Sequence, residues 1–170
     1  LKPSWRNELE IADALQMLIE NNEEIIYDTI TDFWKDTGTP NDIIEANKII
    51  LKNMPSQFKG KKEKNVIIEG NVIVDEGTII RGGVKIVGPV IIGKNCVIDN
   101  NALIGENTSI GDGVKIYGSN ISNSIIMSNC TIKGRFDIKN SIIASNSKIE
   151  QKQDKKYDQF LLGEGTQILL

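Results

Sequence analysis

The feature that most constrains this 170-residue chain is a six-residue repeat that begins at Ile68. Three positions after each repeat start stands a turn former such as Gly, Asn, Pro or Ser, and four positions after it the residue is mostly small. A short strand and a turn, repeated without a helical period, predict a chain that winds into stacked coils. The aliphatic residues that start the nine successive repeats are Ile68, Val74, Ile80, Ile86, Ile92, Ile98, Ile104, Ile110 and Ile116.

With three sides per coil, one coil takes about 18 residues, and neighbouring coils lie ~4.8 Å apart. The aliphatic column is expected to point inward and to stack on copies of itself. The register breaks after Ile116, which predicts a bulge or loop near 118–124, and the period resumes in a shifted frame at Ile126. Cys96 and Cys130 stand among small residues of the repeat, so we interpret them as reduced core thiols.

This pattern resembles the hexapeptide repeat of left-handed β-helices, and the left hand is implied by that resemblance alone. We therefore expect a mainly β fold: a single-stranded left-handed β-helix over residues 66–170, whose C-terminal end is capped by the apolar residues 160–162 and 168–170. A polar linker over 58–65 and a small α/β segment over 1–57 are expected to precede it.

The N-terminal segment has a different pattern. Apolar residues between 8 and 21 recur at helical spacing, residues 25–30 read as a short strand, and Thr39-Pro40 marks the start of a helix that runs to about Asn53. Residues 1–60 carry 6 basic and 11 acidic side chains, whereas 61–170 carry 14 and 12. This change in charge supports two units.

Three stretches of this segment resemble sugar-1-phosphate nucleotidylyltransferases, most closely the long type of glucose-1-phosphate thymidylyltransferase, which carries a β-helix after its catalytic domain. Residues 4–14 resemble an R-G-E-L-E-I-T-D-A run, 33–40 resemble W-x-D-T-G-x-P, and 43–47 resemble L-L-E-A-N. The chain is thus similar to the C-terminal portion of such an enzyme, with residues 1–57 left from its nucleotidyltransferase domain.

The resemblance implies that a sugar 1-phosphate attacks the α-phosphate of dTTP or UTP, with Mg²⁺ and basic side chains neutralising charge. It assigns Asp36 as a metal ligand, although an Asp that holds a turn is an alternative. It places Arg6 and Glu8 at the catalytic wall, and a structural role that pairs or caps the helix near Glu10 is an equal alternative. Trp34, Thr37 and Gly38 are assigned to substrate binding. Asn7 replaces a glycine of the pattern but tolerates the same left-handed backbone.

The chain contains no histidine, which removes the imidazole base of the β-helix acyltransferases and every His-ligated metal site. The family's glycine-rich phosphate loop, its second metal aspartate and its sugar-binding stretch do not occur in these 170 residues. We therefore expect the chain alone to be inactive and to lack a Mg²⁺ site of its own. Because the first residue is Leu, it is expected to be a processed or truncated product.

Six outward positions of the repeat are apolar, which predicts an oligomer interface, most simply of a homotrimer: Ile73, Ile79, Ile91, Val97, Leu103 and Ile121. Cover by the N-terminal segment is an alternative. We expect no nucleic-acid partner and no membrane association, because the net charge is −3 and no long apolar run occurs, and a cytoplasmic location follows as the default. Two other functions stay open: a stand-alone trimerising β-helix, and an acyltransferase with a carboxylate base.

Overall fold

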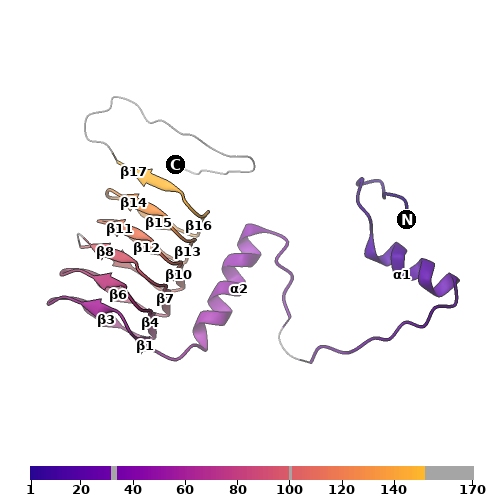
Figure 1. The fold of residues 1–170 in the computed structure, drawn as a ribbon, viewed down its shortest axis with the longest axis horizontal. Helices are drawn as coiled ribbons and strands as arrows, with labels where there is room; N and C mark the ends of the chain where they lie inside the picture. Colours follow the sequence, from indigo (N-terminus) through magenta and orange to yellow (C-terminus); the bar gives the residue numbers. More distant parts are fainter. Residues whose placement is uncertain (32–33, 100, 152–170) are drawn as a thin grey trace. The chain divides into compact units, whose positions relative to one another are not determined.

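The computed structural model describes residues 1–31, 34–99 and 101–151, which fall into two compact units, 1–35 and 36–170. In the first unit, α1 spans Ile11–Glu20 (Figure 1) and none of its residues is buried. The predicted helix is confirmed, but the strand predicted over 25–30 is wrong, since those residues form no regular element. An isolated strand needs a partner for its backbone groups, and none is present among the described residues of this unit.

The second unit opens with α2, which spans Pro40–Lys52. Its start is a capping box, as the sequence predicts. The Thr39 hydroxyl accepts a hydrogen bond from the Asp42 amide at 3.3 Å, and the Thr39 amide donates to the Asp42 carboxylate at 3.1 Å. Pro40 stands at the first helical position, where its missing amide hydrogen costs nothing.

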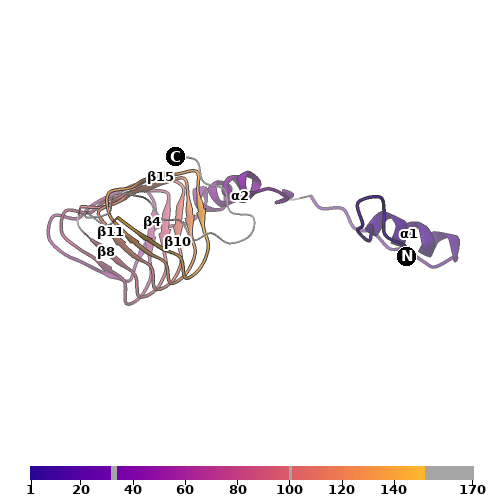
Figure 2. The ribbon, with the colours of Figure 1, turned by 90° about the horizontal axis from the view of Figure 1, so that it is seen from above.

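After α2, the described residues form 17 short strands in three parallel sheets (Figures 1 and 2). Sheet A contains β1 (Gln57–Phe58), β4 (Val72–Val74), β7 (Val90–Ile92), β10 (Thr108–Ile110), β13 (Ile125–Ile126) and β16 (Ile142–Ile143). Sheet B contains β2 (Lys61–Lys62), β5 (Ile79–Ile80), β8 (Val97–Asp99), β11 (Lys115–Tyr117), β14 (Thr131–Lys133) and β17 (Lys148–Glu150). Sheet C contains β3 (Ile67–Glu69), β6 (Lys85–Val87), β9 (Leu103–Ile104), β12 (Asn120–Ser122) and β15 (Asp137–Lys139).

Each strand pairs with the third strand after it, so consecutive strands form the three sides of one coil. Ile80, Ile98 and Ile116 are aligned on sheet B. The inward column forms a continuous core in which every side chain is at most 2% exposed: Val74, Ile80, Ile86, Ile92, Ile98, Ile104, Ile110 and Ile116. The predicted β-solenoid, built on the six-residue repeat, is therefore confirmed, whereas the predicted cap over 160–162 and 168–170 lies outside the described residues.

The solenoid begins earlier than the repeat indicated. Residues 58–65 include the end of β1 and all of β2, which pair with β4 and β5. They therefore belong to the first coil rather than to a linker. The aliphatic pattern misses this coil because Lys62 occupies the position aligned with Ile80, at an end of the stack where its ammonium can reach water.

The register break is a shortening of the coil, not a bulge or loop. The inward residues run Ile116, Ile121 and Ile126, so two successive sides are five residues long instead of six. Ile121 is 1% exposed and aligns with Ile104 and Ile138. Its assignment to an outer interface is wrong, because the shortened side brings it to the inward face.

The corners show why Gly and Asn recur. Positive φ angles occur at Gly77, Gly83, Asn95, Asn101, Asn107 and Gly113, all in the turn-former column. Next to these corners, small polar side chains satisfy buried backbone groups. Thr78 Oγ1, for example, accepts from the Cys96 amide at 2.9 Å and donates to the Gly93 carbonyl at 2.6 Å. Cys96 and Cys130 are free and buried, and burial raises the pKa of both thiols.

Candidate functional site

The residues that precede α1 form a tight polar turn around Arg6. The Arg6 guanidinium lies 2.8 Å from Glu10 and 4.0 Å from Glu8, and the Ser4 hydroxyl donates to Glu10 at 2.8 Å. The Arg6 hydrogen bond lowers the pKa of the Glu10 carboxyl. Asn7 has φ 60, a left-handed backbone conformation that Asn and Gly adopt more readily than other residues. Arg6 therefore does make the structural pairing with Glu10 that the sequence left open.

The segment 34–38 exposes the other predicted site residues. The Trp34 side chain is 68% exposed, and Asp36, Thr37 and Gly38 are all exposed ahead of the α2 capping box. Arg6, Glu8 and Trp34 belong to the first compact unit, whereas Asp36, Thr37 and Gly38 belong to the second. Within the first unit, the described residues bring Arg6 close to Glu8.

Whether these residues could bind Mg²⁺ depends on the oxygen ligands that they supply. Mg²⁺ prefers oxygen ligands in near-octahedral geometry and is commonly held by one or two carboxylates with water and phosphate oxygens. Asp36 supplies one exposed carboxylate, and no group of three or more acidic or cysteine side chains suitable for a metal occurs among residues 1–31, 34–99 and 101–151. Asp36 would therefore supply one oxygen-ligand group to such a site.

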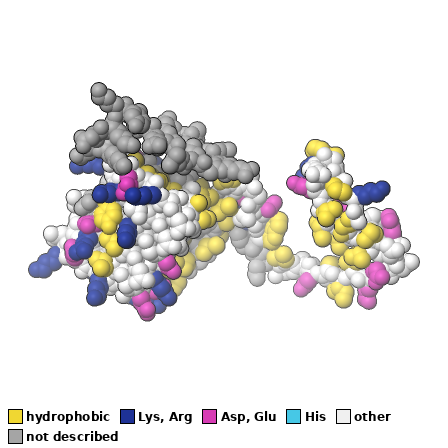
Figure 3. Space-filling view, turned by 45° about the horizontal axis from the view of Figure 1, so that its top comes forward, with side chains coloured by type: hydrophobic (Ala, Val, Ile, Leu, Met, Phe, Trp, Pro, Cys, Tyr) yellow, Lys and Arg dark blue, Asp and Glu magenta, His cyan; other side chains and the backbone are white. Residues whose placement is uncertain are grey.

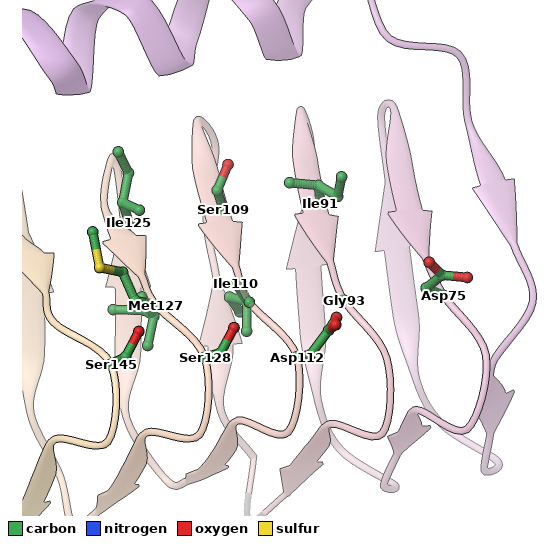
Figure 4. A pocket seen from close by; sticks show the side chains of 12 residues that line it. Asp75, Ile91, Gly93, Ser109, Ile110, Asp112, Ile125, Met127, Ser128 and Ser145 are labelled. Atoms are coloured by element: carbon green, nitrogen blue, oxygen red, sulfur yellow. The ribbon is translucent and has the colours of Figure 1, made fainter. Parts of the chain in front are cut away.

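One groove of the second unit lies on the outer face of sheet A, beside α2, and has a volume of about 470 Å³. Figure 4 shows Ile91, Ser109 and Ile125 projecting from neighbouring strands, with Asp112 and Ser128 at the corners that follow. The groove is open and mostly apolar, and it contains no nucleophile–base pair. Its chemistry fits packing against another surface rather than catalysis.

The Asn47 side chain connects α2 to sheet A. Asn47 donates to the Asn107 carbonyl at 3.0 Å, and its amide oxygen accepts from the Ser109 hydroxyl at 2.5 Å. Ile44 and Leu51, on the same side of the helix, are 5% and 3% exposed. Sequence reasoning missed this contact, although one signal was available. Ser109 is a polar residue in an outward column of sheet A that begins at Gln57 and continues with Ile73, Ile91, Ile125 and Ile142.

Replacing Asn47 with leucine is expected to lower the free energy of unfolding by about 1–2 kcal/mol, because the Ser109 hydroxyl and the Asn107 carbonyl lose their partner. Adding Ser109→Ala should recover part of this loss, since one unpaired group is then removed. Urea unfolding of the single and double variants measures both effects. Lys52→Gln, on the exposed end of α2, is the control and should change stability by less than about 0.5 kcal/mol. An equal effect of Lys52→Gln and Asn47→Leu would contradict the role of Asn47.

The six predicted interface residues do not form one patch. Ile73 and Ile91 lie on sheet A, Ile79 and Val97 on sheet B, Leu103 on sheet C, and Ile121 inside the core. Sheet A has the most apolar outer column, whereas the outer columns of sheets B and C include lysines such as Lys115 and Lys85. Figure 3 shows charged side chains of both signs on the view of the β-helix that it presents.

No helix among the described residues is long and apolar enough to cross a membrane. Comparison with known proteins matches two family models. Residues 1–53 match the model described as nucleotidyl transferase, and residues 86–168 match the one described as the GMPPB C-terminal domain.

Curated relatives include a glucose-1-phosphate thymidylyltransferase of Streptomyces antibioticus, 37% identical over 93 residues, which are 55% of this chain and 26% of the relative. The bifunctional protein GlmU of Methanococcus aeolicus is 46% identical over 82 residues, 48% of this chain and 20% of the relative. The low-salt glycan biosynthesis nucleotidyltransferase Agl11 of Haloferax volcanii is 40% identical over 76 residues, 45% of this chain and 21% of the relative. The chain spans about a fifth to a quarter of the length of these relatives.

Proposed function

Because the chain is a nucleotidylyltransferase-like C-terminal region with a β-solenoid, we propose that it is part of a sugar-1-phosphate nucleotidylyltransferase. The whole enzyme would transfer a nucleotidyl group from dTTP or UTP to a sugar 1-phosphate such as glucose 1-phosphate. The sugar phosphate oxygen forms the new bond to the α-phosphorus, and pyrophosphate leaves. The observation that carries this proposal is the match of residues 1–53 to the nucleotidyl transferase model, in a chain that also resembles glucose-1-phosphate thymidylyltransferases.

In this proposal, the described residues supply one wall of the active site. The turn around Arg6 is held by Ser4 and Glu10, so a cationic group stays in a defined position beside the Glu8 carboxylate. Trp34, Thr37 and Gly38 would contact substrate. Asp36 would contribute one carboxylate to a Mg²⁺ site whose remaining ligands lie outside these 170 residues.

The 170 residues alone are proposed to be inactive. They include no glycine-rich phosphate loop, and their site residues are exposed rather than enclosed. Phosphoryl transfer depends on several charged groups held around the triphosphate at once. Residues that form only one wall of the active site should therefore catalyse no measurable release of pyrophosphate.

The β-solenoid is proposed to serve self-association, most simply as a homotrimer. The support for this role is the apolar outer column of sheet A and the groove beside α2, which includes Ile91, Ile125 and the 42% exposed Met127. An apolar surface of this kind is stabilised when a second copy covers it. The mass of the chain in solution, measured by light scattering, tests this role separately from catalysis, and a monomer at all concentrations would contradict it.

The activity is tested by pyrophosphate release from dTTP or UTP with glucose 1-phosphate and Mg²⁺. We expect turnover from the longer product of the gene, read from the coding sequence that precedes Leu1, and none from residues 1–170. Arg6→Ala in the longer product should lower kcat, while Arg135→Ala, an exposed arginine of the β-helix, is the control. Turnover by the 170-residue chain, or a longer product without turnover, would overturn the proposal.

A stand-alone trimerising β-helix is the alternative, and the compactness of residues 36–170 as a unit favours it. The two functions differ in the native product, because a stand-alone module requires a gene that encodes no catalytic domain. An acyltransferase function is a weaker alternative, since no histidine is available as base. Acetyl transfer from acetyl-CoA to an amino-sugar phosphate would support it.

A further inference from the structure

The N-terminal end of the β-solenoid has open strand edges. β1, β2 and β3 are the first strands of sheets A, B and C, and among the described residues each of them pairs with a strand on one side only. Figure 1 shows β1 and β3 at this end of the stack. The outer edge of such strands presents unpaired backbone amides and carbonyls, which can pair with another chain. This end is therefore a place where a second copy could extend the sheets.

The centre of this end is apolar. A hollow of about 260 Å³ lies here, and Phe58, Ile68 and Val72 contribute to its lining. Phe58 is aligned with Val74 of the next coil and is 39% exposed. Open edges around an apolar centre favour association, because pairing would satisfy backbone groups and remove apolar surface from water at the same time. An end of this kind stays in water only if some feature opposes association.

Lys62 supplies a feature that opposes association. It occupies the inward position aligned with Ile80, and its side chain lines the same hollow. A second copy that stacked on this end would cover the Lys62 ammonium and remove it from water without an opposite charge beside it, which is costly. β1 and β2 are also only two residues long, so they offer little backbone to a partner strand.

The lysines around Lys62 leave this end positively charged. Residues 57–69 contain four lysines and two acidic residues. Both acidic side chains pair with cations of the second coil. Glu63 lies 2.7 Å from Arg81, and Glu69 lies 3.1 Å from Lys85. Within the part of the chain that the structure describes, no ion pair is present at three of the four lysines, which are Lys61, Lys62 and Lys64.

We propose that Lys62, supported by the lysines on either side of it, keeps the N-terminal end of one copy from pairing with the same end of a second copy. Two identical ends carry the same charge, so their contact would place like charges opposite one another, which costs free energy. The inference depends neither on the proposed function nor on self-association through sheet A, because it concerns the strand edges at the end of the solenoid and not its outer faces.

The substitution Lys62→Ile tests the proposal, with Lys61→Ile as the matched control on the same strand. Lys61 is aligned with Ile79 and points outward, so its substitution removes the same charge and adds the same apolar side chain without making the hollow apolar. Light scattering over a range of protein concentrations measures the mass. The Lys62→Ile chain should reach about twice the mass of the wild-type assembly, whereas the Lys61→Ile chain should keep the wild-type mass.

Cross-linking locates the contact. An amine-reactive reagent, applied to a mixture of isotopically labelled and unlabelled Lys62→Ile chains, should join Lys61 or Lys64 of one chain to the same segment of another, as read by mass spectrometry. Association through sheet A would instead give cross-links between chains outside residues 59–64, so the two kinds of contact are distinguished.

An unchanged mass for Lys62→Ile, equal association of Lys61→Ile, or no cross-link between the 59–64 segments of two chains would overturn the proposal. Lys62→Val covers the case in which isoleucine is not accommodated, since valine already occupies an inward position of the next coil at Val74. Lys62→Arg keeps the charge at the same inward position and should keep the wild-type mass. Association of this variant would contradict the role of the charge.

Discussion

Ile98→Ala is expected to lower the free energy of unfolding by about 3–4 kcal/mol, which is a large part of the stability of a domain of this size. Ile98 is fully buried and aligned between Ile80 and Ile116 on sheet B, so it packs against the coil above and the coil below. A cavity at this position cannot be filled by collapse, because the backbone spacing of the coils is set by the hydrogen bonds of three sheets.

The control for this prediction is the neighbouring residue. Val97→Ala removes methyl groups from the same strand, but Val97 points outward and is partly exposed, so the loss should be below about 1 kcal/mol. Urea unfolding followed by circular dichroism measures both variants. Equal losses would show that the alternation of the strand does not decide burial, and the account of the core would then be incorrect.

Gly83→Ala is expected to destabilise the chain by about 2–3 kcal/mol for two separable reasons. Gly83 has φ +84, where a side chain costs about 1 kcal/mol. In addition, a Cβ at Gly83 would occupy the space of the Asn101 side-chain oxygen, which comes from the next coil. An overlap of this kind forces the Asn101 side-chain amide to move from its position.

The second substitution Asn101→Gly separates the two terms. In the pair Gly83→Ala/Asn101→Gly the overlap is gone and only the backbone strain stays, so about half of the loss should be recovered relative to Asn101→Gly alone. Urea unfolding of the three variants completes the cycle. No recovery would mean that the overlap contributes nothing, and the close stacking of corners would then have no energetic consequence.

The fold of residues 66–151 could be predicted well because each repeat is a local pattern with one structural solution. An inward aliphatic residue, a Gly or Asn corner and a small residue beside it are needed at every coil, so a few positions such as Ile80 and Gly83 suffice to recognise the solenoid. The inward position of Ile121 was not predicted. In the sequence, two sides that are five residues long look like a lost repeat, whereas in the structure they bring Ile121 to the inward face.

The candidate site was less predictable. The Thr39 cap and the left-handed Asn7 depend on neighbours in the sequence, and both are present. Asp36 and Trp34 depend on groups far away in the sequence, and the described residues do not supply them. Leu15 and Leu18 of α1 are exposed apolar residues. An amphipathic helix gains most of its stability when its apolar face packs against a partner surface, and the local sequence pattern does not identify that surface.

The amino-acid sequence by itself therefore determined the winding of this protein. The six-residue spacing, the branched aliphatic side chains and the left-handed corners all depend on residues that are one side or one coil apart. Only the tertiary structure decided that α2 joins the β-helix unit, that Asn47 binds Ser109, and that the outer apolar residues are divided among three sheets. These depend on which surfaces meet in space, and no short-range pattern encodes that.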